Sequence, residues 1–361
     1  MLSRVAEDVF WMSRYVERAV AVARLIDVTL SLELDAGIAG EAEDDADLWA
    51  PLLGPASMGG SLTRPIATSA EGNADGADSN GKPSARDVRH HLAFDAENTN
   101  SLVSCIRRAR ASARGVREAI SSEMWEHLNT LHLSLVDTRL MAEAEEAPHS
   151  FFRRVREGCQ FFHGLADCTM AHDEAWDFVT LAKYLERADC VARVVYLQAH
   201  LLTLPDPDRL SSAADPTMRW LTVLRSCGSA EAYARYYSLR VEPARVVEFL
   251  LLNPFFPQSV RFSLGAAWES LRTIHSRRAS PGAASPEIRA LGLLRARLEH
   301  AAVDEVLEEG LHTYLAGVQN RITTVSDHVT RSYLRDEPQA GRVVAVARAA
   351  MIMAAQQQQQ Q

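Results

Sequence analysis

Residues 10–28 read FWMSRYVERAVAVARLIDV, and the centre of this stretch returns later in the chain. Residues 14–24, RYVERAVAVAR, align without a gap with residues 183–193, KYLERADCVAR, and seven of the eleven positions are identical. The identical residues are Tyr15, Glu17, Arg18, Ala19, Val22, Ala23 and Arg24, matched by Tyr184, Glu186, Arg187, Ala188, Val191, Ala192 and Arg193. Such agreement is too close for chance. We therefore predict two related helical halves, each built on one charged amphipathic helix, around residues 10–28 and 176–198.

The repeated stretch has the periodicity of a helix that faces a core. At 100° per residue its apolar side chains share one broad face, which includes Met12, Val16 and Ile26. Glu17 and Arg24 are seven residues apart and nearly eclipsed on the opposite side, and the second copy repeats this relation. If the two helices pair, their acidic and basic side chains can meet across a local two-fold axis.

These charged side chains form the main candidate site, a cluster for an anionic substrate. Guanidinium groups bind carboxylate or phosphate bidentately and stay charged, and the two Glu carboxylates would orient them. The same pattern also fits an interhelical salt-bridge network that fixes helix register, or a solvated face. The candidates are Arg14, Glu17, Arg18, Arg24, Lys183, Glu186, Arg187 and Arg193.

Secondary candidates lie elsewhere in the chain. Asp173 and Glu174 stand where a long helix begins, which suits acidic side chains, and they are alternative acid–base groups. Ser259 and Arg261 lie near another helix start, where backbone N–H groups favour an anion. Glu123 and Glu126 belong to a helix that opens at Ser121 or Ser122. No Glu-x-x-His pattern with suitable partners accompanies them, so no metal site is predicted.

Composition bounds the fold class and excludes some functions. Ala, Leu, Arg and Glu dominate the periodic segments and strand-like alternation is nearly absent, so we predict an all-α, multi-helix bundle. The formal net charge of −9 argues against a dedicated nucleic-acid binder, whose affinity depends on phosphate neutralisation. The five cysteines are widely spaced without a CxxC pair, which favours buried thiols in a reducing compartment. A charged N-terminus and the lack of a long apolar run predict a cytoplasmic protein that does not enter a membrane.

The domain organisation follows from the same periodicity. Residues 1–334 are predicted to form one helical domain, with long helices at 2–36 and 173–201 and two final helices at 287–308 and 309–334. Residues 54–86 are rich in Gly, Ser, Ala, Asn and Asp and are predicted to be a mobile insertion. Residues 335–361 are predicted to hold a C-terminal helix and a low-complexity tail.

Four ordered segments resemble the bacterial alpha-E family. They are MLSRVAEDVFWMSRYVERAVAVARLIDV from residue 1, FDAENTNSLVSCIRRARASARGVREAISSEMWEHLN from residue 94, TMAHDEAWDFVTLAKYLERADCVARVV from residue 169 and VVEFLLLNPFFPQSVRF from residue 246. The chain departs from the family pattern in the 54–86 insertion, in Asn-Thr-Asn-Ser where Asn-Pro-Ser-Ser is usual, and at His172, where an Arg is common. The last departure weakens any transfer of a role to that position.

The resemblance implies which proteins accompany this chain, but it implies no reaction for the chain itself. Alpha-E proteins occur beside, or fused to, circularly permuted ATP-grasp proteins, often with transglutaminase-like proteins nearby. ATP-grasp enzymes activate a carboxylate as an acyl phosphate for attack by an amine. The chain has no phosphate-binding glycine loop, so ATP and Mg²⁺ would be bound by the partner and no cofactor by the chain itself.

Three functions remain open. The first is an accessory protein that docks an ATP-grasp ligase and holds its anionic peptide or carboxylate substrate at the Glu/Arg cluster. The second is an enzyme of acyl or amide transfer that uses Glu17 and Glu186 as acid–base groups. The third is a non-catalytic helical scaffold.

Overall fold

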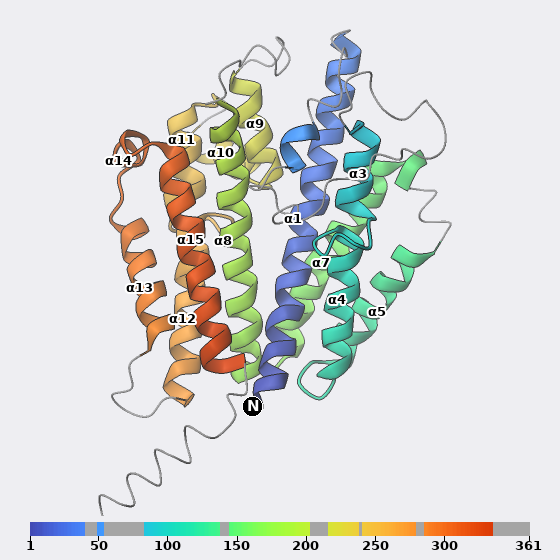
Figure 1. Ribbon diagram of the computed structural model, residues 1–361, viewed down its shortest axis with the longest axis vertical. Coiled ribbons are helices and arrows are strands. Elements are labelled where there is room, and N and C mark those ends of the chain that lie inside the picture. The colour runs from blue at the N-terminus through green and yellow to red at the C-terminus, as the bar shows by residue number, and fades with distance from the viewer. Residues whose placement is uncertain are drawn as a thin grey trace, which may run out of the picture.

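The computed structural model describes residues 1–39, 49–53, 83–137, 144–202, 216–237, 240–278 and 285–334. Within these ranges the protein is all-helical, as the periodicity predicts, and contains no β-strand. Two long helices, α1 (Ser3–Ala39) and α8 (Glu174–Leu202), run side by side through the middle of the molecule (Figure 1). These two helices carry the similar stretches 14–24 and 183–193.

Helices α1 and α8 run in the same direction. The amino group of Met1 lies 2.9 Å from Oε2 of Glu174 at one end. Farther along, the Ser13 hydroxyl donates a hydrogen bond of 2.8 Å to the carbonyl of Val179. Because the helices are parallel, residues at matching positions in the two copies lie at the same level along the bundle.

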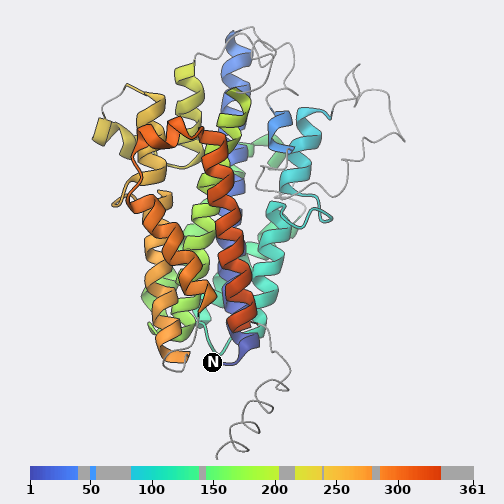
Figure 2. The ribbon, with the colours of Figure 1, turned by 60° about the vertical axis from the view of Figure 1, so that its left-hand side comes forward.

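Each central helix has its own set of neighbours. Helices α4 (Leu102–Gly115) and α7 (Pro148–Thr169) pack on α1, and α5 (Ser122–Val136) packs on both of them. On the other side, α12 (Val260–Arg278) and α15 (Leu311–Val329) pack on α8, and α13 (Pro286–Glu299) covers these two (Figures 1 and 2).

Shorter elements complete the bundle. Helix α3 (Ala85–Ala93) and the 3₁₀ turn η1 (Ala50–Leu53) lie near the C-terminal half of α1. Helices α9 (Pro216–Ser226), α10 (Ala230–Tyr237), α11 (Pro243–Val247) and α14 (Val303–Glu308) gather at the same end of the molecule (Figure 1). Two π-helical turns, η3 (Glu248–Leu252) and η4 (Thr330–Leu334), continue α11 and α15.

The core is built from the apolar faces that the sequence pattern predicts. Phe10, Met12, Phe162 and Phe178 are completely buried, so side chains from α1, α7 and α8 pack in one continuous core. Serine hydroxyls cap helices that face it: Ser101 accepts from the amide of Ser104 at the start of α4. Capping supplies partners for backbone N–H groups that a helix start otherwise leaves unpaired.

Two expectations about element boundaries are wrong. The helix predicted over 287–308 is interrupted, because α13 ends at Glu299 and α14 begins at Val303. The predicted insertion extends too far, because α3 begins at Ala85 behind a capping box in which Ser84 and Asp87 bond each other's backbone amides. The rest of that insertion, and residues 335–361, lie outside the described residues.

Candidate functional site

The two copies of the Glu-Arg dipeptide bind each other across the α1–α8 contact. Arg187 donates to both carboxylate oxygens of Glu17, with Nε 2.6 Å from Oε1 and Nη2 3.1 Å from Oε2. Arg18 binds Glu186 in the same way, at 2.6 and 3.0 Å. Each helix therefore supplies one carboxylate and one guanidinium to a reciprocal pair of bidentate ion pairs. Such forks fix both distance and orientation.

The half of the cluster around Glu186 is sealed. A second guanidinium, that of Arg14, lies with Nε 2.6 Å from Oε2 of Glu186, and it also donates to Ser326 on α15. Arg18 also donates a hydrogen bond of 2.6 Å from Nη1 to Oδ1 of Asn100. The Glu186 side chain is only 1% exposed. The Glu186 carboxylate is thus enclosed by the two arginines and is almost inaccessible to solvent, and we call this half sealed.

The half around Glu17 adjoins a cleft of about 290 Å³. His163 on α7 approaches the carboxylate, with Nε2 2.9 Å from Oε2 of Glu17, but the two groups are not aligned for a hydrogen bond. Lys183, the counterpart of Arg14, does not bind Glu17; its Nζ lies 3.8 Å from Oδ1 of Asp167. The cleft is lined by Glu17, Val20, Gln160, His163, Gly164, Asp167, Lys183, Tyr184, Arg187 and Gln258.

The sequence pattern led us to expect that the charged side chains of both helices form one cluster for an anionic substrate. The cleft instead adjoins Glu17 and Arg187, while Arg14, Arg18 and Glu186 do not line it. The difference has a physical cause. On the Glu186 side, the guanidinium of Arg14 binds the carboxylate and occupies the space beside it. On the Glu17 side, Lys183 does not bind the carboxylate, so the equivalent space stays open.

Electrostatics keeps both carboxylates ionised. Burial alone would raise the pKa of Glu17, but Arg187 and His163 together hold this pKa far below its usual range. Burial likewise opposes ionisation of Glu186, yet Arg14 and Arg18 lower its pKa from 4.5 to about 2. A general acid or base is most effective with a pKa near the working pH, so these two glutamates are poorly suited to proton transfer.

For the basic groups of the cleft, burial lowers the pKa instead of raising it. Burial lowers the pKa of Lys183, and the nearby Arg187 adds to this effect while Asp167 opposes it. Burial also lowers the pKa of His163, although its contact with Glu17 opposes this effect. Lys183 is 7% exposed, and its closest acidic partner, Asp167, has a side chain that is 54% exposed.

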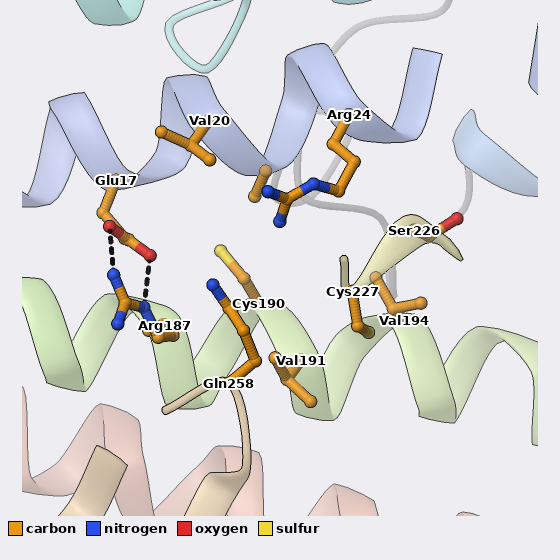
Figure 3. Close-up of a pocket in the computed structure, with 11 residues that line it drawn as sticks. Glu17, Val20, Arg24, Arg187, Cys190, Val191, Val194, Ser226, Cys227 and Gln258 are labelled. Carbon is orange, nitrogen blue, oxygen red and sulfur yellow. Dashed lines mark hydrogen bonds and ion pairs between the residues drawn. The ribbon is translucent and has the colours of Figure 1, made fainter. Parts of the chain in front are cut away.

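Arg24 and Arg193 lie away from the two Glu/Arg pairs, about two helical turns farther along α1 and α8. Arg193 is neutralised by Asp189 on its own helix, with Nε 2.8 Å from Oδ2. Arg24 makes no hydrogen bond or ion pair with the described residues and points into a small pocket of about 20 Å³ between α1 and α8 (Figure 3). This pocket shares Glu17, Arg187 and other lining residues with the cleft.

The secondary candidates have structural partners or lie elsewhere. Asp173 accepts from the backbone amide of Ala175 and so caps α8, while Glu174 binds the Met1 amino group and Arg278. These contacts stabilise one end of the α1–α8 pair, away from the cleft.

The remaining secondary candidates also lie outside both pockets. Ser259 caps α12 by accepting from the amide of Phe262, and Arg261 donates to the carbonyl of Leu252 at 3.3 Å. Glu123 and Glu126 are exposed on α5. Among the residues that the structure describes, no group of three or more metal-ligating side chains is found, and no helix there is long and apolar enough to cross a membrane.

Several cleft residues were not anticipated from the sequence. His163, Asp167 and Gln160 lie on α7 and were not among the candidate residues. Gln258 follows the Asn253–Pro257 turn, and this turn also offers the carbonyl of Pro257 to Arg187 at 3.5 Å. Gln258 stands just before the capping serine of α12, as Asn100 stands just before the capping serine of α4. That shared position was the one available signal.

Comparison with known proteins places the Glu-Arg dipeptides in context. A family model described as "a predicted alpha-helical domain with a conserved ER motif" matches residues 1–334. The sequence contains Glu-Arg only at residues 17–18 and 186–187, which form the two reciprocal pairs. The motif of that description therefore corresponds to the centre of the cluster.

The chain is also similar to three mycobacterial proteins. Uncharacterized proteins of Mycobacterium bovis and of two strains of Mycobacterium tuberculosis are 27% identical to this chain over 342 residues. The aligned part covers 92% of this chain but 37% of each relative, so the chain spans well under half of their length. No solved structure matches the chain.

Proposed function

Because this chain belongs to the Alpha-E family, whose ER motif forms the reciprocal ion pairs, we propose that the Glu17 half of the cluster binds a carboxylate-bearing substrate. The substrate is an acidic peptide or another carboxylate, and the chain holds it for an amide-forming ligase of the ATP-grasp type. The observation that carries this proposal is the cleft beside the Glu17–Arg187 pair, which contains a buried and weakly paired lysine.

Helices α1 and α8 are two copies of one unit in this account, and their differences mark the site. The duplication is supported by the matching sequences and by the reciprocal contacts of Glu17 with Arg187 and of Glu186 with Arg18. Near-identical copies would give two sealed clusters. One half is open, so the substitutions that distinguish it are the candidates for function.

Two pairs of equivalent residues account for the open half. Arg14 binds Glu186 and occupies the space beside this carboxylate. Its counterpart Lys183 does not bind Glu17 and lies closer to Asp167. The side-chain oxygen of Asn100 accepts a hydrogen bond from Arg18, whereas Gln258 at the matching position lines the cleft without a hydrogen bond to a described residue. In each pair, the residue of the sealed half completes an internal contact and its counterpart leaves a polar group available for a ligand.

The choice of lysine at position 183 adds weight. The chain has 38 basic residues, and only two of them, Lys82 and Lys183, are lysines. An ammonium group is a compact point charge with rotatable donors, while a guanidinium is a fixed planar fork. Burial disfavours the charge on Lys183, and a bound carboxylate would restore a counterion to it. We expect the ligand carboxylate to lie between Lys183 and Arg187.

The partner is proposed from the family resemblance. A ligase would supply ATP, Mg²⁺ and the acyl-phosphate chemistry, for which this chain has no phosphate-binding loop, and a transglutaminase-like protein would belong to the same system. The mycobacterial relatives extend far beyond the matched part, as expected if this kind of domain works together with further ones. The depressed pKa values of Glu17 and Glu186 disfavour the alternative in which these residues perform acid–base catalysis.

Co-expression with the ATP-grasp protein encoded nearest to the chain's gene tests this function. We expect the two proteins to co-elute and an amide product, found by mass spectrometry, to appear only when both are present. The Lys183→Met substitution is expected to reduce the product by about tenfold or more, because it removes a charge-assisted contact to the substrate. Lys82→Met, which changes the other lysine, serves as the matched control.

A further variant separates binding from folding. Lys183→Arg keeps the positive charge but introduces the fork that seals the Glu186 half, so it should lower product formation while the helical circular dichroism signal and the unfolding midpoint stay unchanged. Full product formation with both Lys183→Met and Lys183→Arg would refute the proposed site.

A further inference from the structure

The second pocket between α1 and α8 contains the half-buried guanidinium of Arg24, which has no acidic partner within the described part of the chain. We propose that Arg24 anchors a second anion subsite, which binds a second carboxylate of the same ligand, so that the ligand is an acidic peptide with two carboxylates. This inference rests on the proposed function, because the two subsites are parts of one continuous site. Figure 3 shows the Arg24 guanidinium extending from α1 into the pocket above Cys190.

The guanidinium of Arg24 lies against the backbone at Gly228. Gly228, just after the end of α9, has φ +62, and a Cβ atom at this position would lie 2.7 Å from Cζ of Arg24. The glycine thus permits both the left-handed backbone turn and the close approach of the guanidinium. The guanidinium of Arg24 therefore packs closely against the backbone turn at Gly228.

The other copy of the repeat shows what a neutralised arginine looks like at this position. Arg193, the counterpart of Arg24, is bound by Asp189 one helical turn earlier. The residue equivalent to Asp189 in α1 is Val20, which lines both pockets and has no charge. The chain therefore provides an internal counterion in one copy and lacks it in the copy that faces the open half.

No nearby acidic group takes over this role among the described residues. The charged groups that act on Arg24 are Arg156, Arg187 and Glu17. Arg156 is already bound to Asp27, and Glu17 is already bound bidentately by Arg187. Burial and the two arginines lower the pKa of Arg24, yet a guanidinium remains charged at any physiological pH. A bound anion would relieve this uncompensated charge.

The lining and spacing of the pockets identify the class of ligand. The walls around Arg24 are mainly apolar, with Val20, Ala21, Val191 and Val194, which suits a carboxylate on an aliphatic stem. Arg24 is level with residue 193 of the parallel α8, ten residues beyond Lys183, or about 15 Å along the helix axis. Long side chains shorten this span by several ångströms. A peptide of two or three residues bridges it, whereas a small dicarboxylate such as succinate does not.

Titration calorimetry with a blocked tripeptide tests the subsite. The probe is acetyl-Glu-Ala-Glu-amide, compared with the two versions in which one Glu is replaced by Gln. We expect the diacidic peptide to bind the wild-type chain about 10- to 100-fold more tightly than either monoacidic version. Arg24→Gln should remove this advantage and leave the affinity for the better monoacidic peptide unchanged.

Matched variants use the difference between the two copies. Val20→Asp supplies Arg24 with the counterion that Asp189 gives Arg193, so it should abolish the diacid advantage, while Val20→Asn should retain it. Arg193→Gln should have no effect on binding. Without ligand, Arg24→Gln should unfold at the same or higher urea concentration than the wild type, since it removes an unpaired charge.

The results distinguish failure of the subsite from failure of the proposed function. If Lys183→Met abolishes binding of the diacidic peptide but Arg24→Gln leaves its affinity unchanged, the Arg24 subsite is wrong and the cleft stands. If Arg24→Gln strongly destabilises the ligand-free chain, Arg24 has a structural role instead. If none of the three peptides binds the wild-type chain at millimolar concentration, both proposals are wrong.

Discussion

Replacing Glu186 by Gln is expected to lower the free energy of unfolding by about 3–5 kcal/mol, because it leaves two buried guanidiniums without a countercharge. Arg14 and Arg18 both bind this carboxylate at 2.6 Å, and their side chains are only 8% and 16% exposed. Neither can turn to water without breaking its other contact, to Ser326 or to Asn100. Urea unfolding, followed by circular dichroism, measures the change.

Glu17→Gln is the matched control for this prediction. Glu17 neutralises one guanidinium rather than two, and it adjoins the cleft, where water can reach Arg187. We expect a smaller loss, of about 1–3 kcal/mol. An equal or larger loss for Glu17→Gln would contradict the description of one sealed and one open half.

Stability is expected to fall steeply below about pH 4.5. The pKa of Glu186 is lowered from 4.5 to about 2 in the folded chain, and that of Glu17 is lowered further. Below pH 4.5 the unfolded chain takes up protons on these carboxyls while the folded chain does not, so acid favours unfolding. The stabilisation is fully present above pH 4.5 and is lost as the pH falls through the folded-state values.

The size of this effect follows from the same values. A tenfold change in proton affinity corresponds to about 1.4 kcal/mol, so Glu186 alone contributes about 3 kcal/mol that is lost between pH 4.5 and pH 2. Unfolding midpoints in urea, measured from pH 7 to pH 2.5, report the loss. Glu186→Gln should flatten this pH dependence. A variant that keeps the full wild-type slope would show that other carboxyls cause the acid sensitivity.

The sequence was sufficient to predict the all-helical fold and the two central helices. Helices predicted over 2–36 and 173–201 are observed at Ser3–Ala39 and Glu174–Leu202. Their length and strong periodicity made them readable, because amphipathic spacing is the clearest signal that a single sequence offers. The break between α13 and α14 carries no such signal, since the residues 300–302 include neither Pro nor Gly.

The pairing of charges was also predictable in part, but the open half was not. The two Glu-Arg dipeptides predicted that Glu17 and Glu186 meet arginines of the opposite helix. The exchange of Arg14 for Lys183 was visible in the aligned stretches, but the contacts that follow from it, to Glu186 in one half and toward Asp167 in the other, depend on tertiary packing that a local pattern does not contain. The exchange of Asp189 for Val20 was visible in the aligned repeat, yet its consequence for Arg24 emerges only when Gly228 is seen beneath the guanidinium.

The two lysines of the chain allow a direct measurement of ligand binding in the cleft. Protein labelled with ¹³C at lysine Cε gives one resonance each for Lys82 and Lys183, which the Lys183→Arg variant assigns. On titration with acetyl-Glu-Ala-Glu-amide, we predict a saturable shift of the Lys183 resonance while that of Lys82 stays in place. A Lys183 resonance that does not move, with peptide at millimolar concentration, would contradict the assignment of this cleft as a carboxylate site.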